Sequence, residues 1–225
     1  SCAFKCCSGF IGKLTIPKFV DLIGSNAFKN CFGFSGDLTI PDSINTIKSG
    51  TFSGCYGFNG TLTIPNSVEF IESNAFDNCW RLSGSLLIPE SVKSIGSNAF
   101  KNCSSFTGQL KIPNSVVSIE SGAFNQCCRL SGSLVIPNSI KTIKSDVFNG
   151  CFGFNETLTI PNSVTTIESC TFCNCSGFVG SLIIPNTVTY IGTNAFFNCY
   201  SFSGQLTISN SIERIESGTF YNCTN

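Results

Sequence analysis

Histidine and methionine are absent from this chain of 225 residues, and charged side chains are few. Without histidine, the chain lacks the commonest general base, the usual base of a catalytic triad and the commonest zinc ligand. Thirteen Lys and Arg balance thirteen Asp and Glu, and charged residues make up 12% of the chain. This balance provides no basic footprint for phosphate backbones, so we expect no nucleic-acid partner. Because histidine is absent, we also expect no enzymatic activity, and we expect no cofactor.

Long apolar runs are also absent. No stretch approaches the ~20 apolar residues that span a bilayer, so we expect no direct insertion into a membrane. The chain opens with Ser1 and has no signal-like apolar segment, which fits a mature or excerpted segment. Because 42% of the residues are hydrophobic, the composition predicts a folded chain.

The sequence repeats itself every 24 residues. Leu-Thr-Ile-Pro at 14–17 returns as Leu-x-Ile-Pro at 38–41, 62–65, 86–89, 110–113, 134–137, 158–161 and 182–185, and as Leu-Thr-Ile-Ser at 206–209. We call each 24-residue unit a rung, and the residues that share a position in successive rungs a column. The array predicts nine rungs and a partial one over 1–225, with no clear capping domain.

Seven columns are apolar, and a unit this short cannot bury such a face alone. They begin at Leu14, Ile16, Val20, Ile23, Phe28, Cys31 and Phe34. Stacked rungs bury these columns in one continuous core, so the repeat predicts a solenoid shaped as a rod or shallow arc.

Each rung has a predicted order of short elements. Leu-Thr-Ile alternates with period two and ends at a proline, which predicts one short parallel strand. The Val20 and Ile23 columns predict a second short extended or turn segment. Residues 25–31 begin with Ser and contain no proline, so they predict a single α or 3₁₀ turn that carries Phe28 into the core.

The pattern Ile-Pro-x-Ser-Val-x-x-Ile-x-x-x-Ala-Phe-x-x-Cys, seen at 88–103, resembles the leucine-rich repeat of BspA-type surface proteins. The resemblance covers essentially the whole chain. It implies a leucine-rich repeat solenoid located outside the cell or at the cell surface. It also implies adhesion or protein-protein recognition, with a protein or cell-surface ligand such as a host matrix protein.

Ten of the fifteen cysteines occupy one column: Cys7, Cys31, Cys55, Cys79, Cys103, Cys127, Cys151, Cys175, Cys199 and Cys223. Such a column suits a small buried side chain beside a backbone turn, so we expect these cysteines to be free thiols. Disulfides between successive rungs are the alternative, because a rung spacing of ~4.8 Å lies within the range that disulfides span. Side chains that point in parallel argue against that alternative.

Five cysteines lie outside this column, at Cys2, Cys6, Cys128, Cys170 and Cys173. With column members, four of them form two clusters, Cys170, Cys173 and Cys175, and Cys2, Cys6 and Cys7. Neither cluster supplies four spaced ligands, so we expect no zinc site. Cys170 and Cys173 are candidates for local pairing. Cys2, Cys6 and Cys128 are candidates for pairing with a neighbouring molecule.

Two outward columns are candidate binding surfaces. The outward column of the strand face carries threonine in most rungs. Four other residues in this column would form a semi-apolar strip: Leu87, Lys111, Val135 and Ile183. The column after Cys31 carries aromatic residues at Phe32, Tyr56, Trp80, Phe152 and Tyr200. Exposed apolar patches and aromatic rings are favoured in interfaces. The alternatives are simple β-propensity on the strand face and shielding of the core edge by the rings.

Charged residues alternate in the Gly24 column, where Lys48 precedes Glu72, and Glu120 and Glu168 flank Lys144. We expect these neighbours to form exposed pairs that fix register.

The two ends have no polar cap, so head-to-tail self-assembly into a filament is the alternative function. Its candidate contact residues are Phe4, Lys5, Phe10, Lys13, Glu213, Glu216 and Phe220.

Overall fold

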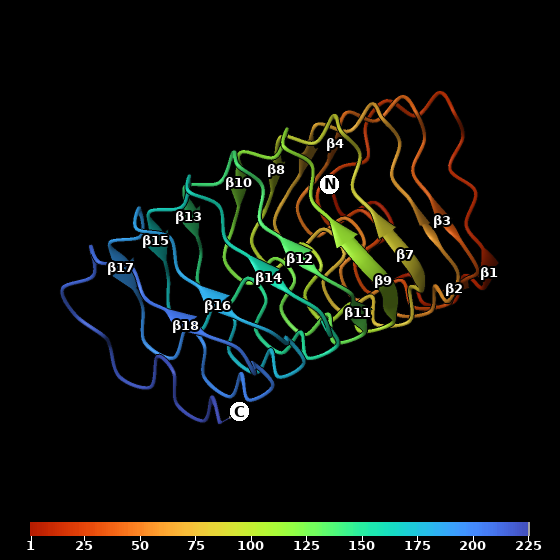
Figure 1. Ribbon diagram of the computed structural model, residues 1–225. Coiled ribbons are helices and arrows are strands. Elements are labelled where there is room, and N and C mark those ends of the chain that lie inside the picture. Colours follow the sequence, from red (N-terminus) through yellow and green to blue (C-terminus); the bar gives the residue numbers. More distant parts are fainter. Residues whose placement is uncertain (225) are drawn as a thin grey trace.

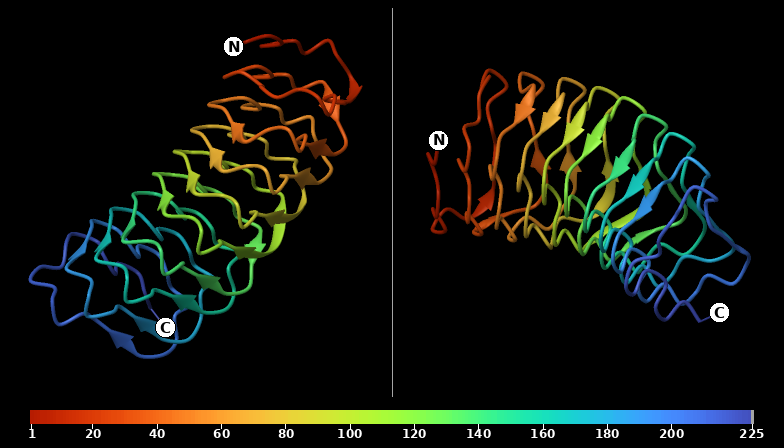
Figure 2. Two further views of the ribbon diagram at one scale, coloured as in Figure 1. Left: turned by 90° about the horizontal axis from the view of Figure 1, so that it is seen from above. Right: turned by 90° about the vertical axis from the view of Figure 1, so that its left-hand side faces the viewer.

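The computed structural model is a stack of parallel rungs, as the repeat predicts (Figure 1). It describes residues 1–224, so Asn225, the last residue of the predicted array, lies outside the described residues. The stack bends gently along its length, and the two termini lie at opposite ends (Figure 2).

The first wall of the solenoid contains the strands predicted at Leu-x-Ile-Pro. They are β3 (Leu38–Thr39), β5 (Leu62–Thr63), β7 (Gly84–Leu87), β9 (Phe106–Lys111), β12 (Leu134–Val135), β14 (Leu158–Thr159), β16 (Leu182–Ile183) and β18 (Leu206–Thr207). Three further short strands precede this position in their rungs, β1 (Gly12–Lys13), β2 (Phe34–Ser35) and β11 (Leu130–Ser131). All partners are parallel. Residues of the motif pair with residues 24 positions away, as Leu38 does with Leu62, whereas the residues before it pair 22 positions away, as Gly12 does with Phe34.

The second wall confirms the extended segment expected around the Ile23 column. Its strands are β4 (Thr46–Ile47), β6 (Phe70–Ile71), β8 (Ser94–Ile95), β10 (Ser118–Ile119), β13 (Thr142–Ile143), β15 (Thr166–Ile167) and β17 (Tyr190–Ile191). A turn closed by a hydrogen bond from Val68 N to Pro65 O, 3.1 Å long, joins the first wall to the second. The buried isoleucine of each strand, such as Ile71, faces the core.

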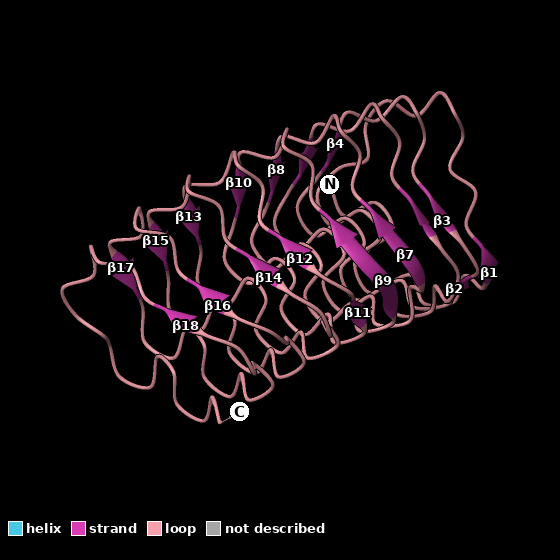
Figure 3. Cartoon of the chain, in the orientation of Figure 1, coloured by secondary structure: helices cyan, strands magenta, loops and turns pink. Residues whose placement is uncertain are grey.

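The α or 3₁₀ turn expected at 25–31 does not form, and the described residues contain no helix (Figure 3). Alternate amides of this segment bond in different directions. Cys31 N–H donates to Phe28 O within the rung at 3.0 Å, whereas Phe28 N–H donates to Thr51 O of the next rung at 2.9 Å. Because a helix would keep all of these amides inside the segment, stacking between rungs replaces it.

Two columns of this segment adopt left-handed backbone conformation throughout the array. The Asn26 column has φ between 55° and 69°, and the Asn30 column has φ between 58° and 74°. Asparagine and glycine fill most of these positions, since they tolerate this region best. The two columns reverse the chain direction so that Phe28, between them, enters the core.

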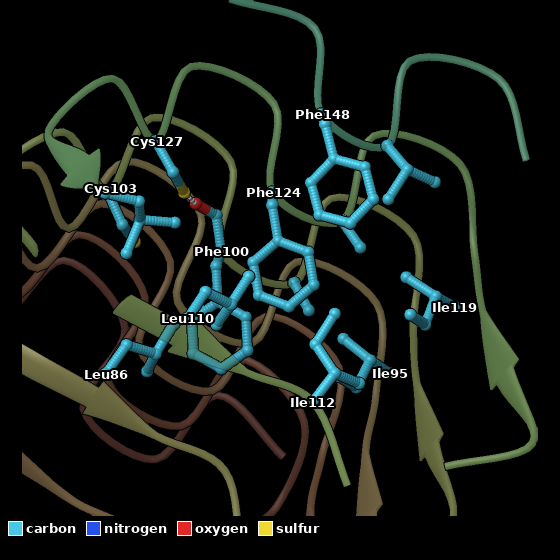
Figure 4. Close-up of a cluster of buried hydrophobic side chains, with 14 of the residues drawn as sticks. Leu86, Ile95, Phe100, Cys103, Leu110, Ile112, Ile119, Phe124, Cys127 and Phe148 are labelled. Atoms are coloured by element: carbon cyan, nitrogen blue, oxygen red, sulfur yellow. Dashed lines mark hydrogen bonds between the residues drawn. The ribbon is translucent and has the colours of Figure 1, made fainter. Parts of the chain in front are cut away.

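The core is built around a continuous column of phenylalanine rings. Each ring stacks on the next, with ring centroids 5.2–5.7 Å apart, over the whole column: Phe4, Phe28, Phe52, Phe76, Phe100, Phe124, Phe148, Phe172, Phe196 and Phe220. Leucine and isoleucine from both walls pack around these rings (Figure 4). Such burial of apolar area is the main stabilising contribution to each rung.

The cysteine column holds free thiols rather than a disulfide ladder. Each thiol from Cys31 to Cys223 donates to the carbonyl of the phenylalanine 27 residues before it. Cys127 Sγ, for example, lies 3.1 Å from Phe100 O (Figure 4). The thiol therefore serves as a small hydrogen-bond donor that satisfies a buried carbonyl of the preceding rung.

Two of the predicted charge pairs form between adjacent rungs. Lys48 Nζ lies 3.0 Å from Glu72 Oε1, and Lys144 Nζ lies 3.3 Å from Glu168 Oε1. Each glutamate also accepts bonds from the amide and hydroxyl of a serine in the preceding rung, as Glu72 does from Ser49. No ion pair joins Glu120 to Lys144 among residues 1–224.

Hydrogen bonding decides the pKa of these glutamates. Burial acts to raise the pKa of Glu72, but the bonds from Lys48 and Ser49 outweigh it and hold the pKa below its usual value of 4.5. Burial opposes the same shift at Glu168, where bonds from Ser145 and Lys144 prevail. Since both pairs are about one-third exposed, each contributes about 1 kcal/mol at most.

Replacing Cys103 by alanine should lower the free energy of unfolding by about 2 kcal/mol, because Phe76 O loses its thiol donor and a small cavity forms. Serine retains a donor, so Cys103→Ser should cost less than Cys103→Ala. Urea denaturation followed by circular dichroism measures both. If serine is as destabilising as alanine, the thiol-to-carbonyl bond is not the stabilising feature of this column.

The double variant Glu72→Gln/Glu168→Gln should flatten the loss of stability in acid. A carboxylate whose pKa is lower in the folded state stabilises above the unfolded value of 4.5, and this contribution is lost as the pH falls through the lower folded value. Urea midpoints measured from pH 7 to pH 3 test this. Glu69→Gln/Glu90→Gln is the matched control, and equal curves for the two double variants would contradict the assignment.

Candidate recognition surfaces

The strand-face strip lies on the outer side of the first wall, as the alternation predicts. Leu87, Val135 and Ile183 are 52–69% exposed. Leu87 pairs directly with Lys111 across β7 and β9, and β12 with Val135 lies beside β9 (Figure 1). Thr159 then separates Val135 from Ile183. The structure therefore brings Leu87, Lys111 and Val135 together and leaves Ile183 apart from them.

A shallow hollow of about 310 Å³ lies over this part of the wall. Lys111 and Val135 line it, together with Asn114 and Asn138, each of which lies three residues beyond the end of its strand. Apolar surface, a cation and side-chain amides thus meet around one depression. This mixture suits contact with a protein surface, where apolar and hydrogen-bonding groups occur side by side.

The aromatic column forms a true stack over its first three members. The centroids of Phe32 and Tyr56 are 5.1 Å apart with ring planes inclined by 3°, and those of Tyr56 and Trp80 are 5.9 Å apart with an inclination of 19°. The three side chains are 37–46% exposed. We refer to Phe32, Tyr56 and Trp80 as the aromatic stack.

The neighbours of the stack determine which parts of the rings reach solvent. Phe32 covers one face of the Tyr56 ring and Trp80 covers the other. Because both faces of the Tyr56 ring are covered by neighbouring rings, its edges are its main exposed part. The Arg81 guanidinium carbon lies 5.9 Å from the Trp80 ring centroid. Such cation–π contact favours a fixed position of Arg81 beside the stack.

Phe152 and Tyr200 share the column but do not join the stack. Both side chains are exposed. Ser104 and Cys128 separate Phe152 from Trp80, and Ser176 separates it from Tyr200. These two rings therefore stand as isolated aromatic residues on the same side of the solenoid.

Sequence reasoning missed a further set of exposed aromatic residues. Phe70 and Tyr190 project outward from the second wall, and the exposed Tyr221 stacks on the half-buried Phe197 with ring centroids 5.0 Å apart. The alternation of Phe70 with the buried Ile71 was the available signal. Phe197 and Tyr221 occupy the column of Lys5 and Lys29, where reading down the column identifies them as neighbours.

The residues predicted to make end-to-end contacts lie at the two termini, far apart in the stack (Figure 2). Phe4 and Phe220 keep their places in the phenylalanine column. A hollow of about 440 Å³ in the first rung is lined by apolar residues that include Phe4 and Phe10. Lys5, Lys13 and Glu213 are exposed, while Glu216 pairs with Arg214 at 3.3 Å. Head-to-tail contact remains a prediction.

The cysteines outside the column are placed on turns. Cys2 and Cys6 are exposed, Cys128 is half-buried, and Cys170 and Cys173 lie on one turn. No group of three metal-binding side chains occurs in the part of the chain that the structure describes. Within the same residues, no helix has the length and apolar character required to cross a bilayer.

Comparison with solved structures identifies similar solenoids. A leucine-rich repeat protein from T. pallidum is 26% identical, with a TM-score of 0.63 over 86% of this chain and 78% of that one. A leucine rich cell surface protein from Faecalibacterium prausnitzii is 30% identical, with a TM-score of 0.59 over 89% of this chain and 48% of that one. This chain thus spans about half of the F. prausnitzii protein. A leucine-rich repeat protein from Eubacterium ventriosum, 15% identical with a TM-score of 0.55, shares the fold.

No curated protein matches this sequence. The family comparison is more informative, since the BspA type Leucine rich repeat region matches in six copies, over residues 1–107, 23–155 and 152–225. These matches together extend over the chain from its first residue to its last, and this chain therefore belongs to the BspA-type leucine-rich repeat family.

Proposed function

We propose that this chain is a non-enzymatic module of a cell-surface or extracellular protein, and that it binds protein partners through the aromatic stack. The BspA-type fold is typically a non-enzymatic binding scaffold, and one similar structure is described as a cell surface protein. The observation that carries the proposal is the contiguous exposed stack of Phe32, Tyr56 and Trp80.

The direction of the rings favours a protein over a glycan. Sugar rings bind aromatic side chains by lying over their faces, whereas here Tyr56 has a neighbouring ring over each face. Exposed edges suit the side chains of a protein, because an edge packs well against aliphatic groups and, in T-shaped geometry, against the face of a second ring. Tryptophan and tyrosine, the residue types of Trp80 and Tyr56, are also enriched among the residues that contribute most of the binding energy in protein interfaces.

The strand-face strip extends the proposed interface on the first wall. Threonine is the commonest residue at this outward position, so Leu87 and Val135 add exposed apolar area that the sheet itself does not need. Apolar side chains that cluster on a surface favour association with a partner. Lys111 between them supplies a charge for orientation of that partner.

Catalysis is not part of the proposal. Histidine is absent from the chain, so a nucleophilic thiol would have no imidazole to activate it. The thiols of the cysteine column are unsuited to attack, since burial raises the pKa of Cys55 to about 12. The proposed role of the chain at the surface is adhesion by non-covalent binding, with extracellular matrix proteins as the first class to examine.

The triple variant Phe32→Ser/Tyr56→Ser/Trp80→Ser should bind at least ~30-fold more weakly, since loss of buried aromatic anchors costs about 2 kcal/mol or more. Surface plasmon resonance against a panel of purified extracellular matrix proteins measures the affinity. Phe152→Ser/Tyr200→Ser removes the isolated rings of the same column and should stay within ~2-fold of the parent. Equal losses in the two variants, or no binding to any panel member, would reject the proposal.

The contribution of the strand-face strip can be measured in the same experiment. Leu87→Thr/Val135→Thr restores the residue common at this position and should weaken binding ~10-fold, which corresponds to about 1.4 kcal/mol. Val117→Thr on the second wall is the matched control, because Val117 is equally exposed there. An unchanged affinity of the double variant would remove the strip from the interface.

Head-to-tail assembly is the second candidate, favoured by the apolar hollow around Phe10 in the first rung. If this contact forms, the molar mass measured by light scattering should rise with protein concentration above the 24.1 kDa of one chain. Phe10→Ser should suppress the rise, whereas Val117→Thr should leave it intact. A constant mass near that of one chain would exclude assembly.

A further inference from the structure

Cys170 occupies a backbone position that cysteine rarely fills. The Asn26 column has left-handed φ in all ten rungs, and eight of them carry asparagine, glycine or aspartate there. Cys170, with φ of 55°, is one of two cysteines in the column. Because a side chain without a local hydrogen-bonding amide or carboxyl group gains nothing at such a position, Cys170 costs free energy in the fold.

The turn that begins at Cys170 brings a second thiol next to the first. Cys173 N–H donates to Cys170 O at 3.2 Å, which closes a turn of four residues. In such a turn the first and last Cα atoms lie within about 7 Å, and disulfides bridge Cα atoms about 4.4–6.8 Å apart. The turn therefore places the Cα atoms of Cys170 and Cys173 at a distance that a disulfide can span.

The preceding rung shows that side chains at these two positions reach each other. Asp146 and Asn149 hold the same places there, and Asn149 Nδ2 donates to Asp146 Oδ1 at 2.8 Å. The same backbone turn, with an N–H to O distance of 3.2 Å in both rungs, carries Cys170 and Cys173. The fourth side chain of this turn can therefore contact the first.

The two thiols differ in access and in acidity. Cys170 is half-buried, whereas Cys173 is 8% exposed. Burial and then Asp146 raise the pKa of Cys170, but hydrogen bonds from Asn194 and Cys173 oppose this rise. Burial, followed by Cys170 and Asp146, raises the pKa of Cys173 to about 11. Cys170 is therefore the thiol that reacts first with a reagent from solution.

We propose that Cys170 and Cys173 are a modification site that forms an intramolecular disulfide by exchange with a small-molecule disulfide. The Cys170 thiolate attacks one sulfur of the reagent and releases one thiol, which leaves a mixed disulfide on Cys170. The Cys173 thiol then loses its proton, attacks the Cys170 sulfur and releases the second thiol. Overall, two protein thiols are oxidised to a disulfide and one reagent disulfide is reduced to two thiols.

The neighbouring cysteine is not a competing partner. Cys175 lies two residues further on, but it is fully buried and its thiol donates to Phe148 O at 3.0 Å. The disulfide would fix the left-handed turn at Cys170 and offset the cost of cysteine there. It would also resist reduction, because neither thiolate is stabilised in the reduced protein.

Peptide mapping by mass spectrometry tests the site on the folded, reduced chain after incubation with glutathione disulfide and alkylation. The expected product is a 170–173 peptide that has lost two hydrogen atoms and carries no glutathione. In Cys173→Ser, Cys170 should accumulate the glutathione adduct. In Cys170→Ser, the adduct at Cys173 should form at least ~10-fold more slowly. Cys103 should stay unmodified throughout, which confirms that the fold is intact.

Three outcomes would overturn the proposal. They are a stable glutathione adduct on Cys170 of the parent chain, alkylation of both thiols after oxidation, and linkage of either cysteine to another residue.

A second readout is thermal unfolding. Oxidation should raise the Tm of the parent by a few degrees and leave the Cys170→Ser/Cys173→Ser variant unchanged, and equal shifts in the two proteins would assign the effect to other cysteines.

Discussion

From Phe4 to Phe196, the carbonyl oxygen of each residue in the phenylalanine column accepts two hydrogen bonds, and the geometry of the whole array depends on this pairing. Phe100 O receives Cys103 N–H from its own rung and the Cys127 thiol from the next, each at 3.1 Å. Because this carbonyl is buried away from water, both bonds offset its desolvation. A larger or displaced side chain would break the second bond. The contact therefore requires a small donor in the cysteine column and a constant period of 24 residues.

The repeat made most of the fold predictable because each apolar column has one environment in every rung. Leu38 and Ile71 could be assigned to opposite walls from their spacing to the proline and the following turn. The 25–31 turn was harder, since Ser25 before Asn26 also suits the start of a helix. The useful signal was the exchange of asparagine with glycine at Gly50 and Gly122, which indicates left-handed backbone.

The position of the two candidate surfaces could be predicted from the sequence, but their shape could not. Alignment of columns put Phe32, Tyr56 and Trp80 in adjacent rungs, and parallel stacking then made them neighbours. The ring planes depend on side-chain torsions and on Arg81, which the repeat pattern does not specify. For the same reason, the coverage of both faces of the Tyr56 ring required the structure.

Departures from a column's common residue are the places where this fold can acquire a specific property. Inward columns have little freedom, because Phe28 stacks on rings of the rungs on both sides and Cys31 bonds to Phe4 O of the preceding rung. Outward positions have no such constraint, so Leu87 in place of threonine adds apolar surface and still pairs with Lys111. Cys170 is more informative still, since it replaces asparagine or glycine at a left-handed position where it stabilises nothing by itself. A residue that costs stability in one rung, beside a second thiol found in that rung, indicates chemistry rather than packing.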